Sequence, residues 1–266
     1  MDFDFIIGVA KEAGRAILEV YNTDFEVIQK QDRSPLTLAD TRSHAIISGA
    51  LTERYPDIPV LSEEGREIAF EQRRDWQRFW LVDPLDGTKE FVKRNGEFTV
   101  NIALIKDRMP VFGLIYIPVA DRVFVADVDE GCFEISSGGR KKLSVSPISS
   151  QTPVRVARSR SHPAPGLEQL LSLIPSHQVI NRGSALKFCL VAAGEADFYP
   201  RFGPTWEWDT AAGHAIVAAA GGVMVDLCGN PFLYNKESLL NGPFIVSSSM
   251  VWLRETGMLE AASKLG

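Results

Sequence analysis

An apolar strand that runs directly into two carboxylates constrains this chain more than any other segment. Residues 79–82 read Phe-Trp-Leu-Val and lead into Asp83 and Asp86. Pro84 and Gly87 are expected to shape a turn between the two acids. Strand ends that face a crevice are where α/β proteins bind ligands, and two acids held close together there repel each other unless a cation lies between them. The segment therefore predicts a divalent metal site for a ligand that carries phosphate.

Each position in this segment suits such a site. The Asp83 carboxylate offers two oxygens, and Mg²⁺ prefers oxygen ligands. The Leu85 carbonyl is a neutral oxygen that the preceding proline could aim into the site. Gly87 allows an unusual backbone and close approach of a ligand, and Thr88 supplies a hydroxyl and an amide where a helix is expected to begin. The alternative is a solvated surface turn, which the abrupt change from an apolar strand disfavours.

Two further acidic segments adjoin predicted elements. Glu63 and Glu64 follow a short strand expected at residues 60–62, although paired glutamates are often only solvated surface charges. Asp209 is interpreted as the N-cap of a helix over residues 210–220. The small residues 211–213 would let a ligand approach that helix N-terminus, or would serve only for tight packing.

The hydrophobic pattern predicts a first α+β lobe over residues 1–146 that carries the metal motif. Amphipathic helices are expected over residues 3–21 and from about residue 37, with Tyr55-Pro56 ending the second. A meander of strands is then expected at about 97–106, 111–117, 121–126 and 132–136.

Beyond the polar stretch 144–152, strands alternate with helices, which predicts an α/β lobe over residues 147–266. The strands are expected at 154–157, 178–180, 196–199, 223–226 and 244–248. The helices are expected at 165–173, 185–193, 210–220 and the C-terminus.

Composition narrows the class of ligand. The 266 residues carry a formal net charge of −6, with 45% hydrophobic and 23% charged residues, as in an ordinary globular protein. Binding to a nucleic-acid polymer needs a surplus of Lys and Arg, so we do not expect such a partner. A small anionic substrate stays compatible, because bound metal ions reverse the local field.

The remaining bulk features favour a cytoplasmic protein. The three cysteines allow no disulfide framework and no CxxC motif, and Cys189 and Cys228 are expected to be core thiols. The acidic N-terminus is unlike a signal peptide, and the longest apolar stretch, residues 215–225, is too short to span a membrane. Oligomeric state and loose association with the inner membrane stay open.

Three motifs resemble those of the lithium-sensitive, magnesium-dependent phosphatases of the inositol monophosphatase superfamily: Glu-Glu-Gly (63–65), Asp-Pro-Leu-Asp-Gly-Thr (83–88) and Trp-Asp-Thr-Ala-Ala-Gly (208–213). Further stretches narrow the resemblance, which covers nearly the whole chain, to 3'(2'),5'-bisphosphate nucleotidases of the bacterial CysQ type. These stretches are residues 86–91, 94–105, 159–162, 183–191, 199–205 and 208–215. Lys89-Glu90 is the most useful marker against plain inositol phosphatases. The fold implied is the layered α-β-α-β-α sugar-phosphatase fold with two lobes.

The resemblance also implies site residues. Two to three Mg²⁺ ions would be held by Glu63, Asp83, Asp86, Asp209 and the Leu85 carbonyl. Asp40, with Thr88, would activate the nucleophilic water, and Glu63 is the other acid that could do so. The substrate contacts implied are Glu63, Leu85, Asp86, Gly87, Thr88, Ser159, His162, Gly183, Lys187 and Asp209.

The implied activity is hydrolysis of the 3'(2')-phosphate of adenosine 3',5'-bisphosphate (PAP) to AMP and phosphate, in sulfur assimilation. The sulfated nucleotide PAPS, which would give APS, is a further candidate substrate. Phosphoryl transfer needs charge neutralisation and in-line placement of water, which paired metal ions provide. Four converging carboxylates would be untenable without cations.

Some interpretations stay open. His162 is expected to donate to phosphate or adenine, with a simple loop histidine as the alternative. Trp206 and Trp208 flank Asp209 and are expected to pack under the helix, with base stacking as the alternative.

Three other functions compete with this one. A phosphatase of the same fold could act on inositol monophosphate or a sugar phosphate. A haloacid-dehalogenase-type phosphatase would form an aspartyl phosphate, but its acids lie two residues apart, not three. A nucleotide sensor would need no water-activating pair.

Overall fold

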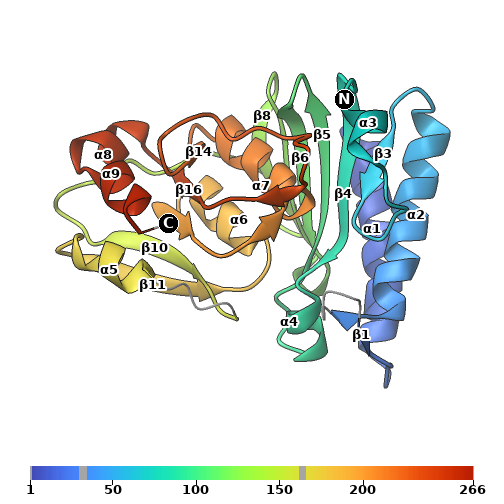
Figure 1. The fold of residues 1–266 in the computed structure, drawn as a ribbon. Coiled ribbons are helices and arrows are strands. Elements are labelled where there is room, and N and C mark those ends of the chain that lie inside the picture. Colours follow the sequence, from blue (N-terminus) through green and yellow to red (C-terminus); the bar gives the residue numbers. More distant parts are fainter. Residues whose placement is uncertain (1, 30–34, 162–165, 266) are drawn as a thin grey trace.

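The computed structural model describes residues 2–29, 35–161 and 166–265 and shows five layers (Figure 1). Helices and sheets alternate, so the predicted α-β-α-β-α arrangement is confirmed. Helices α1 (Phe3–Tyr21) and α2 (Leu38–Arg54) form the first layer, on one face of the larger sheet. Both were predicted from their periodicity, and α2 ends directly before Tyr55-Pro56.

The larger sheet has seven strands in the order β3-β4-β5-β6-β7-β8-β9. Only β3 and β4 pair in parallel, and the other neighbours are antiparallel. The strands are β3 (Val60–Ser62), β4 (Arg78–Asp86), β5 (Thr99–Lys106), β6 (Met109–Ile117), β7 (Arg122–Asp127), β8 (Gly131–Ser136) and β9 (Gly139–Leu143). The predicted meander is thus confirmed and extended by one strand.

Strand β9 was not predicted, because it lacks the alternation of a half-buried strand. It reads Gly-Arg-Lys-Lys-Leu, and its first four residues are exposed. As an edge strand it gains from charged side chains, which discourage pairing with another sheet. The charged side chains that protect this edge of the sheet therefore also remove the hydrophobic periodicity by which a strand is predicted.

The smaller sheet has five strands in the order β11-β10-β12-β16-β14. Strand β10 is parallel to β11 and β12, whereas β16 is antiparallel to β12 and β14. The strands are β10 (Val154–Ser159), β11 (His177–Arg182), β12 (Phe198–Arg201), β14 (Val223–Asp226) and β16 (Phe244–Ser247).

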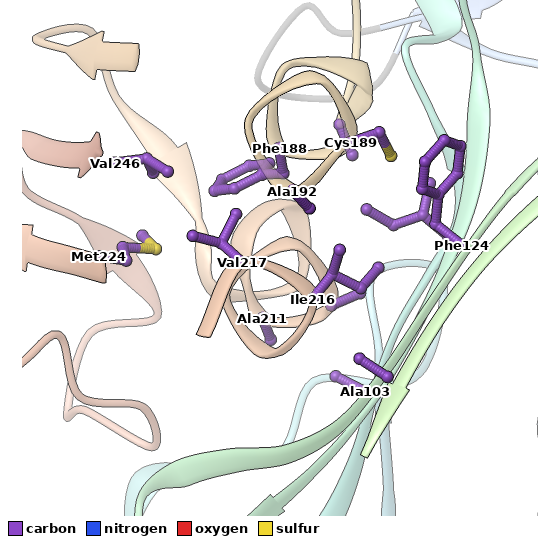
Figure 2. Close-up of a cluster of buried hydrophobic side chains, with 14 of the residues drawn as sticks. Ala103, Phe124, Phe188, Cys189, Ala192, Ala211, Ile216, Val217, Met224 and Val246 are labelled. Atoms are coloured by element: carbon purple, nitrogen blue, oxygen red, sulfur yellow. The ribbon is translucent and has the colours of Figure 1, made fainter. Parts of the chain in front are cut away.

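Helices α6 (Leu186–Ala192) and α7 (Glu207–Ala219) fill the layer between the two sheets. Figure 2 shows their side chains in one hydrophobic core with residues of both sheets. A side chain at Gly213 would place its Cβ 2.3 Å from a Phe188 ring atom, and one at Gly113 would come 2.4 Å from the Ala212 carbonyl. The small residues 211–213 therefore serve close packing of α7 against α6 and β6, which corrects the idea that they make room for a ligand.

Helices α5 (Leu167–Ser172), α8 (Met250–Glu255) and α9 (Met258–Ser263) form the last layer, on the outer face of the smaller sheet (Figure 1). The single predicted C-terminal helix is wrong. Gly257 interrupts it with a φ of 69°, in the left-handed region that favours glycine.

The short elements are helices α3 (Phe70–Arg73), α4 (Thr88–Val92) and the 3₁₀ helix η1 (Pro118–Ala120), and two ribbons. The ribbons pair β1 (Ile28–Gln29) with β2 (Pro35–Leu36), and β13 (Thr205–Trp206) with β15 (Leu240–Asn241).

The predicted change of organisation near residue 146 falls between the two sheets. Strands β3 to β9 precede it and β10 to β16 follow it, apart from the short ribbons. Helix α7 from the second part packs on β5 and β6 of the first. Division into lobes 1–146 and 147–266 as folding units stays a prediction.

Two bulk expectations can be compared with the structure. Cys189 is buried as expected, but Cys228 is exposed, since it lies in a turn in which its N–H donates to Asp226 (2.8 Å). Among the residues that the structure describes, no helix has both the length and the apolar character needed to cross a membrane.

Candidate active site

The acidic segment after the apolar strand is a β-bulge inside β4, not a turn. Asp83 pairs with Asn101 of β5 and Asp86 pairs with Thr99, so two residues of β4 lie opposite one of β5. Asp83 is 1% exposed and Leu85 is 2% exposed, so the surface-turn interpretation is wrong.

Hydrogen bonds hold the bulge in place. The Leu85 N–H donates to the Asp83 carboxylate (3.1 Å), and the hydroxyl of Ser43 on α2 donates to the Pro84 carbonyl (2.7 Å). Gly87 follows with a φ of 91°, and Thr88 begins α4 as expected. The bulge therefore turns Asp83 inward and leads the chain directly into the short helix.

Three carboxylates from distant parts of the chain meet beside this bulge. Glu63, Asp83 and Asp209 each offer an oxygen atom, and these atoms lie within 4.8 Å of one another. The Glu63 N–H donates to the carbonyl of Val82 (3.1 Å), which fixes Glu63 beside β4. We call these three residues the carboxylate cluster.

Asp209 reaches the cluster from the first turn of α7, but it is not the N-cap. The helix begins at Glu207, which makes Asp209 its third residue, and its carboxylate accepts the main-chain N–H of Trp206 (2.8 Å). The acid thus caps the helix from inside the first turn. An N-cap assignment from sequence was wrong because Trp-Glu-Trp contains no residue with a capping preference.

Asp86, the fourth predicted metal ligand, lies at the side of the carboxylate cluster. It lines the same cavity as Glu63 and Asp209. One of its oxygens accepts the hydroxyl of Ser184 at 2.6 Å. The structure thus brings three of the four predicted acids into one cluster and places the fourth beside it.

Burial raises the pKa of both Asp83 and Asp209 well above the usual carboxyl range, and the charges of neighbouring acids raise it further. Burial also raises the pKa of Asp86, with Ser184 and Lys187 acting in the opposite direction. Buried like charges can be relieved by protons or by a cation. A set of hard oxygen donors suits a divalent cation such as Mg²⁺, so the donor set fits the predicted metal.

Asp40 and Thr88, the predicted water-activating pair, are in contact although 48 residues separate them. The Thr88 hydroxyl donates to Asp40 Oδ1 (3.3 Å) and lies 3.4 Å from the Leu85 carbonyl oxygen. Asp40 Oδ2 accepts both the N–H and the hydroxyl of Thr37, each at 2.7 Å. These bonds orient the Asp40 carboxylate and, through it, the hydroxyl of Thr88.

A cavity of about 660 Å³ opens beside Thr88 and the carboxylates of Glu63, Asp86 and Asp209. Its walls include Glu63, Asp86, Gly87, Thr88, Ser159, Lys187 and Asp209, all predicted as site residues. Asp40, Asp83, Leu85 and Gly183 were also predicted as site residues, but they are not among the described residues that line the cavity. The Gly183 N–H donates to Glu97 (2.7 Å). His162 lies outside the described residues.

Two buried cations, Lys187 and Arg201, line the same cavity as the acids. Lys187 is 4% exposed and donates to the carbonyl oxygens of Ser184 and Arg182. Burial lowers its pKa to about 8, although the charge of Asp86 acts against the shift. Arg201 is 9% exposed and donates to the carbonyls of Gly203 and Pro204, both at 3.2 Å.

Arg201 and Ser184 were missed as site residues. Both occur in stretches used for the family resemblance, 199–205 and 183–191, but neither was given a role. Arg201 ends strand β12, and Phe-Gly-Pro follows it. A basic residue at a strand end is a signal that could have identified it.

A buried polar network supports the start of α7. Glu207 is fully buried and pairs with Lys236 at 2.5 Å. Lys236 also donates to Asn241 (2.9 Å), whose amide donates to the carbonyl of Trp206 (2.7 Å). This network ties the loop before α7, and with it Asp209, to strand β15.

The family model for the inositol monophosphatase family matches residues 3–260. The chain belongs to this family. Among relatives of known name, the 3'(2'),5'-bisphosphate nucleotidase CysQ of Salmonella typhimurium is 49% identical over 242 residues (90% of this chain, 96% of the relative). The CysQ of Escherichia coli K12 is 48% identical over 247 residues (92% and 98%).

A solved structure of the inositol monophosphatase family shows the same fold. CysQ from Bacteroides thetaiotaomicron is described as a bacterial member of that family and superposes with a TM-score of 0.81 at 41% identity. The match covers 91% of this chain and 95% of the other. Both the predicted family and the predicted fold are therefore confirmed.

Proposed function

We propose that the protein is a magnesium-dependent 3'(2'),5'-bisphosphate nucleotidase that converts PAP and water to AMP and phosphate. One observation carries the proposal: Glu63 and Asp209 of the carboxylate cluster line the same cavity as the buried cations Lys187 and Arg201. A substrate with two phosphates can place the scissile one at bound metal ions and the other at the cations. The similarity to the CysQ proteins supports this assignment.

The proposed metal ligands are the carboxylate cluster, Asp86 and the Leu85 carbonyl, holding two to three Mg²⁺ ions. Bound divalent cations neutralise phosphate charge and lower the pKa of the attacking water. Without a cation, burial and mutual repulsion disfavour the charged forms of Asp83 and Asp209, because both raise the pKa of these carboxyl groups. We therefore propose that activity requires Mg²⁺ and is lost in chelator.

The residues Asp40 and Thr88 are proposed to orient the attacking water. Because the Thr88 hydroxyl donates to Asp40, a lone pair of Thr88 Oγ1 is left to accept a hydrogen bond from water. A water proton can then pass through Thr88 to Asp40. Glu63 is the other acid that could accept it. The water oxygen forms the new bond to phosphorus, the bond from phosphorus to the ribose oxygen breaks in line, and that oxygen takes up a proton from solvent to become the 3'-hydroxyl of AMP.

The substrate contacts proposed from the family motifs are Gly87, Thr88, Ser159, His162, Gly183 and Lys187. Lys187 has the clearest physical role, because a buried ammonium group gains most from an anionic partner. Arg201 joins this set, since a guanidinium matches the geometry of a phosphate.

The second candidate is a phosphatase for inositol monophosphate or a sugar phosphate. The family name favours this candidate. A substrate with a single phosphate, however, would place that phosphate at the metal ions and would have no second phosphate to bind the buried cations. PAPS remains a candidate substrate, because it carries the same 3'-phosphate.

The test is phosphate release from PAP, its 2' isomer, PAPS and inositol 1-phosphate, with Mg²⁺ and with chelator. We expect kcat/KM for PAP to exceed that for inositol 1-phosphate by about tenfold or more, which corresponds to about 1.4 kcal/mol. Preference for the inositol ester would refute the proposed substrate. Unchanged phosphate release in chelator would refute the metal dependence.

A further inference from the structure

Trp206 presents a large aromatic surface at the active-site cavity. It lies in β13 directly before α7, it lines the cavity, and it remains 39% exposed. The sequence favoured packing under the helix for both neighbouring tryptophans. That holds for Trp208, which packs against the core between the sheets, but not for Trp206.

The position of the Trp206 ring is set by its neighbours. Its indole stacks on that of Trp208, with ring centroids 5.4 Å apart and planes inclined by 14°. Its main-chain N–H donates to Asp209 (2.8 Å), and its carbonyl accepts the Asn241 amide (2.7 Å). The ring is therefore held in a fixed relation to the carboxylate cluster.

Leu240 extends the same apolar surface. It is the cross-strand partner of Trp206 in the β13–β15 ribbon, it is 44% exposed, and it lines the cavity. A cyclitol ring is not aromatic and would meet this surface only with C–H and hydroxyl groups. A planar heterocycle gains much more, since stacking on an aromatic side chain strengthens binding by roughly 5- to 150-fold per base.

The aromatic surface also adjoins a cation of the same cavity. Arg201 donates to the carbonyl of Pro204 (3.2 Å), two residues before Trp206, and Arg201, Pro204 and Trp206 all line the cavity. We propose that Trp206, with Leu240 beside it, is the platform on which the purine of the substrate stacks. This makes Trp206 a specificity-determining residue, and the inference rests on the proposed nucleotidase function.

The test compares a substrate that has a base with one that lacks it. The substrates are PAP and methyl ribofuranoside 3,5-bisphosphate, and the variants are Trp206→Ala and Trp206→Phe. In the alanine variant we expect KM for PAP to rise about tenfold, with kcat and the KM of the base-free substrate changed by less than about twofold. Phenylalanine keeps an aromatic face and should restore KM to within about threefold of the wild type.

A tryptophan outside the cavity provides the control. Trp252 on α8 packs against Phe198, and Trp252→Ala should leave the ratio of the two KM values unchanged. Equal losses on both substrates in Trp206→Ala would overturn the platform and indicate a role in placing Asp209. An unchanged KM for PAP would overturn it as well. Failure of the nucleotidase function itself would show differently, as a wild-type enzyme that prefers inositol 1-phosphate to PAP.

Discussion

Replacing Asp83 by Asn should stabilise the metal-free protein and remove its response to magnesium. Asp83 is 1% exposed, and oxygens of Glu63 and Asp209 lie within 4.8 Å of it. Burial raises its pKa well above the usual value of 3.8, and the neighbouring acids raise it further. An amide of the same shape still accepts the Leu85 N–H, and it can also donate to Glu63, which an ionised Asp83 cannot.

Coulomb's law gives the scale of the effect. Two unit charges 4.8 Å apart repel by roughly 3.5 kcal/mol at an effective dielectric constant of about 20, and Asp83 has two such neighbours. Retained protons relieve part of this repulsion, so we expect Asp83→Asn to raise the free energy of unfolding at pH 8 by about 2 kcal/mol. For a chain of this size that corresponds to a rise of roughly 4–8 °C in Tm.

The sign of the pH dependence follows from the raised pKa. The folded pKa of Asp83 lies above its unfolded value, so the metal-free wild type loses stability as pH rises from about 3.8 towards the folded pKa. The deficit persists at higher pH. The advantage of Asp83→Asn should therefore be largest at pH 8 and should shrink at pH 5.

The assay is thermal unfolding followed by circular dichroism, in chelator and in excess Mg²⁺. At 100 times its dissociation constant, Mg²⁺ should stabilise the wild type by about 2.7 kcal/mol and Asp83→Asn hardly at all. Asp57→Asn, at an exposed acid, is the matched control and should change neither result. A lower Tm of Asp83→Asn than of the wild type in chelator would contradict the prediction, and so would an unreduced shift in Tm with magnesium.

Three further changes test other parts of the site. Asp40→Asn should lower kcat roughly 10²- to 10³-fold with little effect on KM, because the amide would donate to Thr88 and turn its proton away; steady-state kinetics that show a normal kcat would contradict this. In the wild type, KM for PAP should rise as pH passes about 8, since Lys187 loses its charge there. Lys187→Met should have a high KM at every pH, and a persistent break near pH 8 in this variant would assign the titration to another group. Lys236→Met should cost about 3–5 kcal/mol in urea unfolding, because it leaves the buried Glu207 unpaired; adding Glu207→Gln should recover part of that loss, and no recovery would show that the ion pair is not the cause.

The sequence predicts well those parts of the fold that repeat a simple pattern. Helix α1 follows apolar spacing, and α2 is bounded by a capping threonine at 37 and by Pro56. The parts that depend on distant partners were missed. The Asp86 carboxylate accepts a hydrogen bond from Ser184, which is 98 residues away, and no local sequence pattern indicates that hydrogen bond.

In the candidate site, too, some features could be predicted from the sequence and others depend on distant partners. The acids at 63, 83 and 209 stand beside predicted strand and helix ends, so their convergence could be anticipated from fold class and family motifs. The way in which Asp209 caps α7 could not be anticipated from the sequence. It depends on the N–H of Trp206, which donates to Asp209, and on the Asn241 amide, which donates to the Trp206 carbonyl. The same support leaves the Trp206 ring exposed, where sequence reasoning expected it to be packed.

The most direct measurement is anomalous diffraction from crystals of the protein soaked in Mn²⁺, a stand-in for Mg²⁺ with a strong anomalous signal. We expect a peak within about 2.5 Å of carboxylate oxygens of Glu63, Asp83 and Asp209. A peak at other acids, with none at these three, would contradict this expectation.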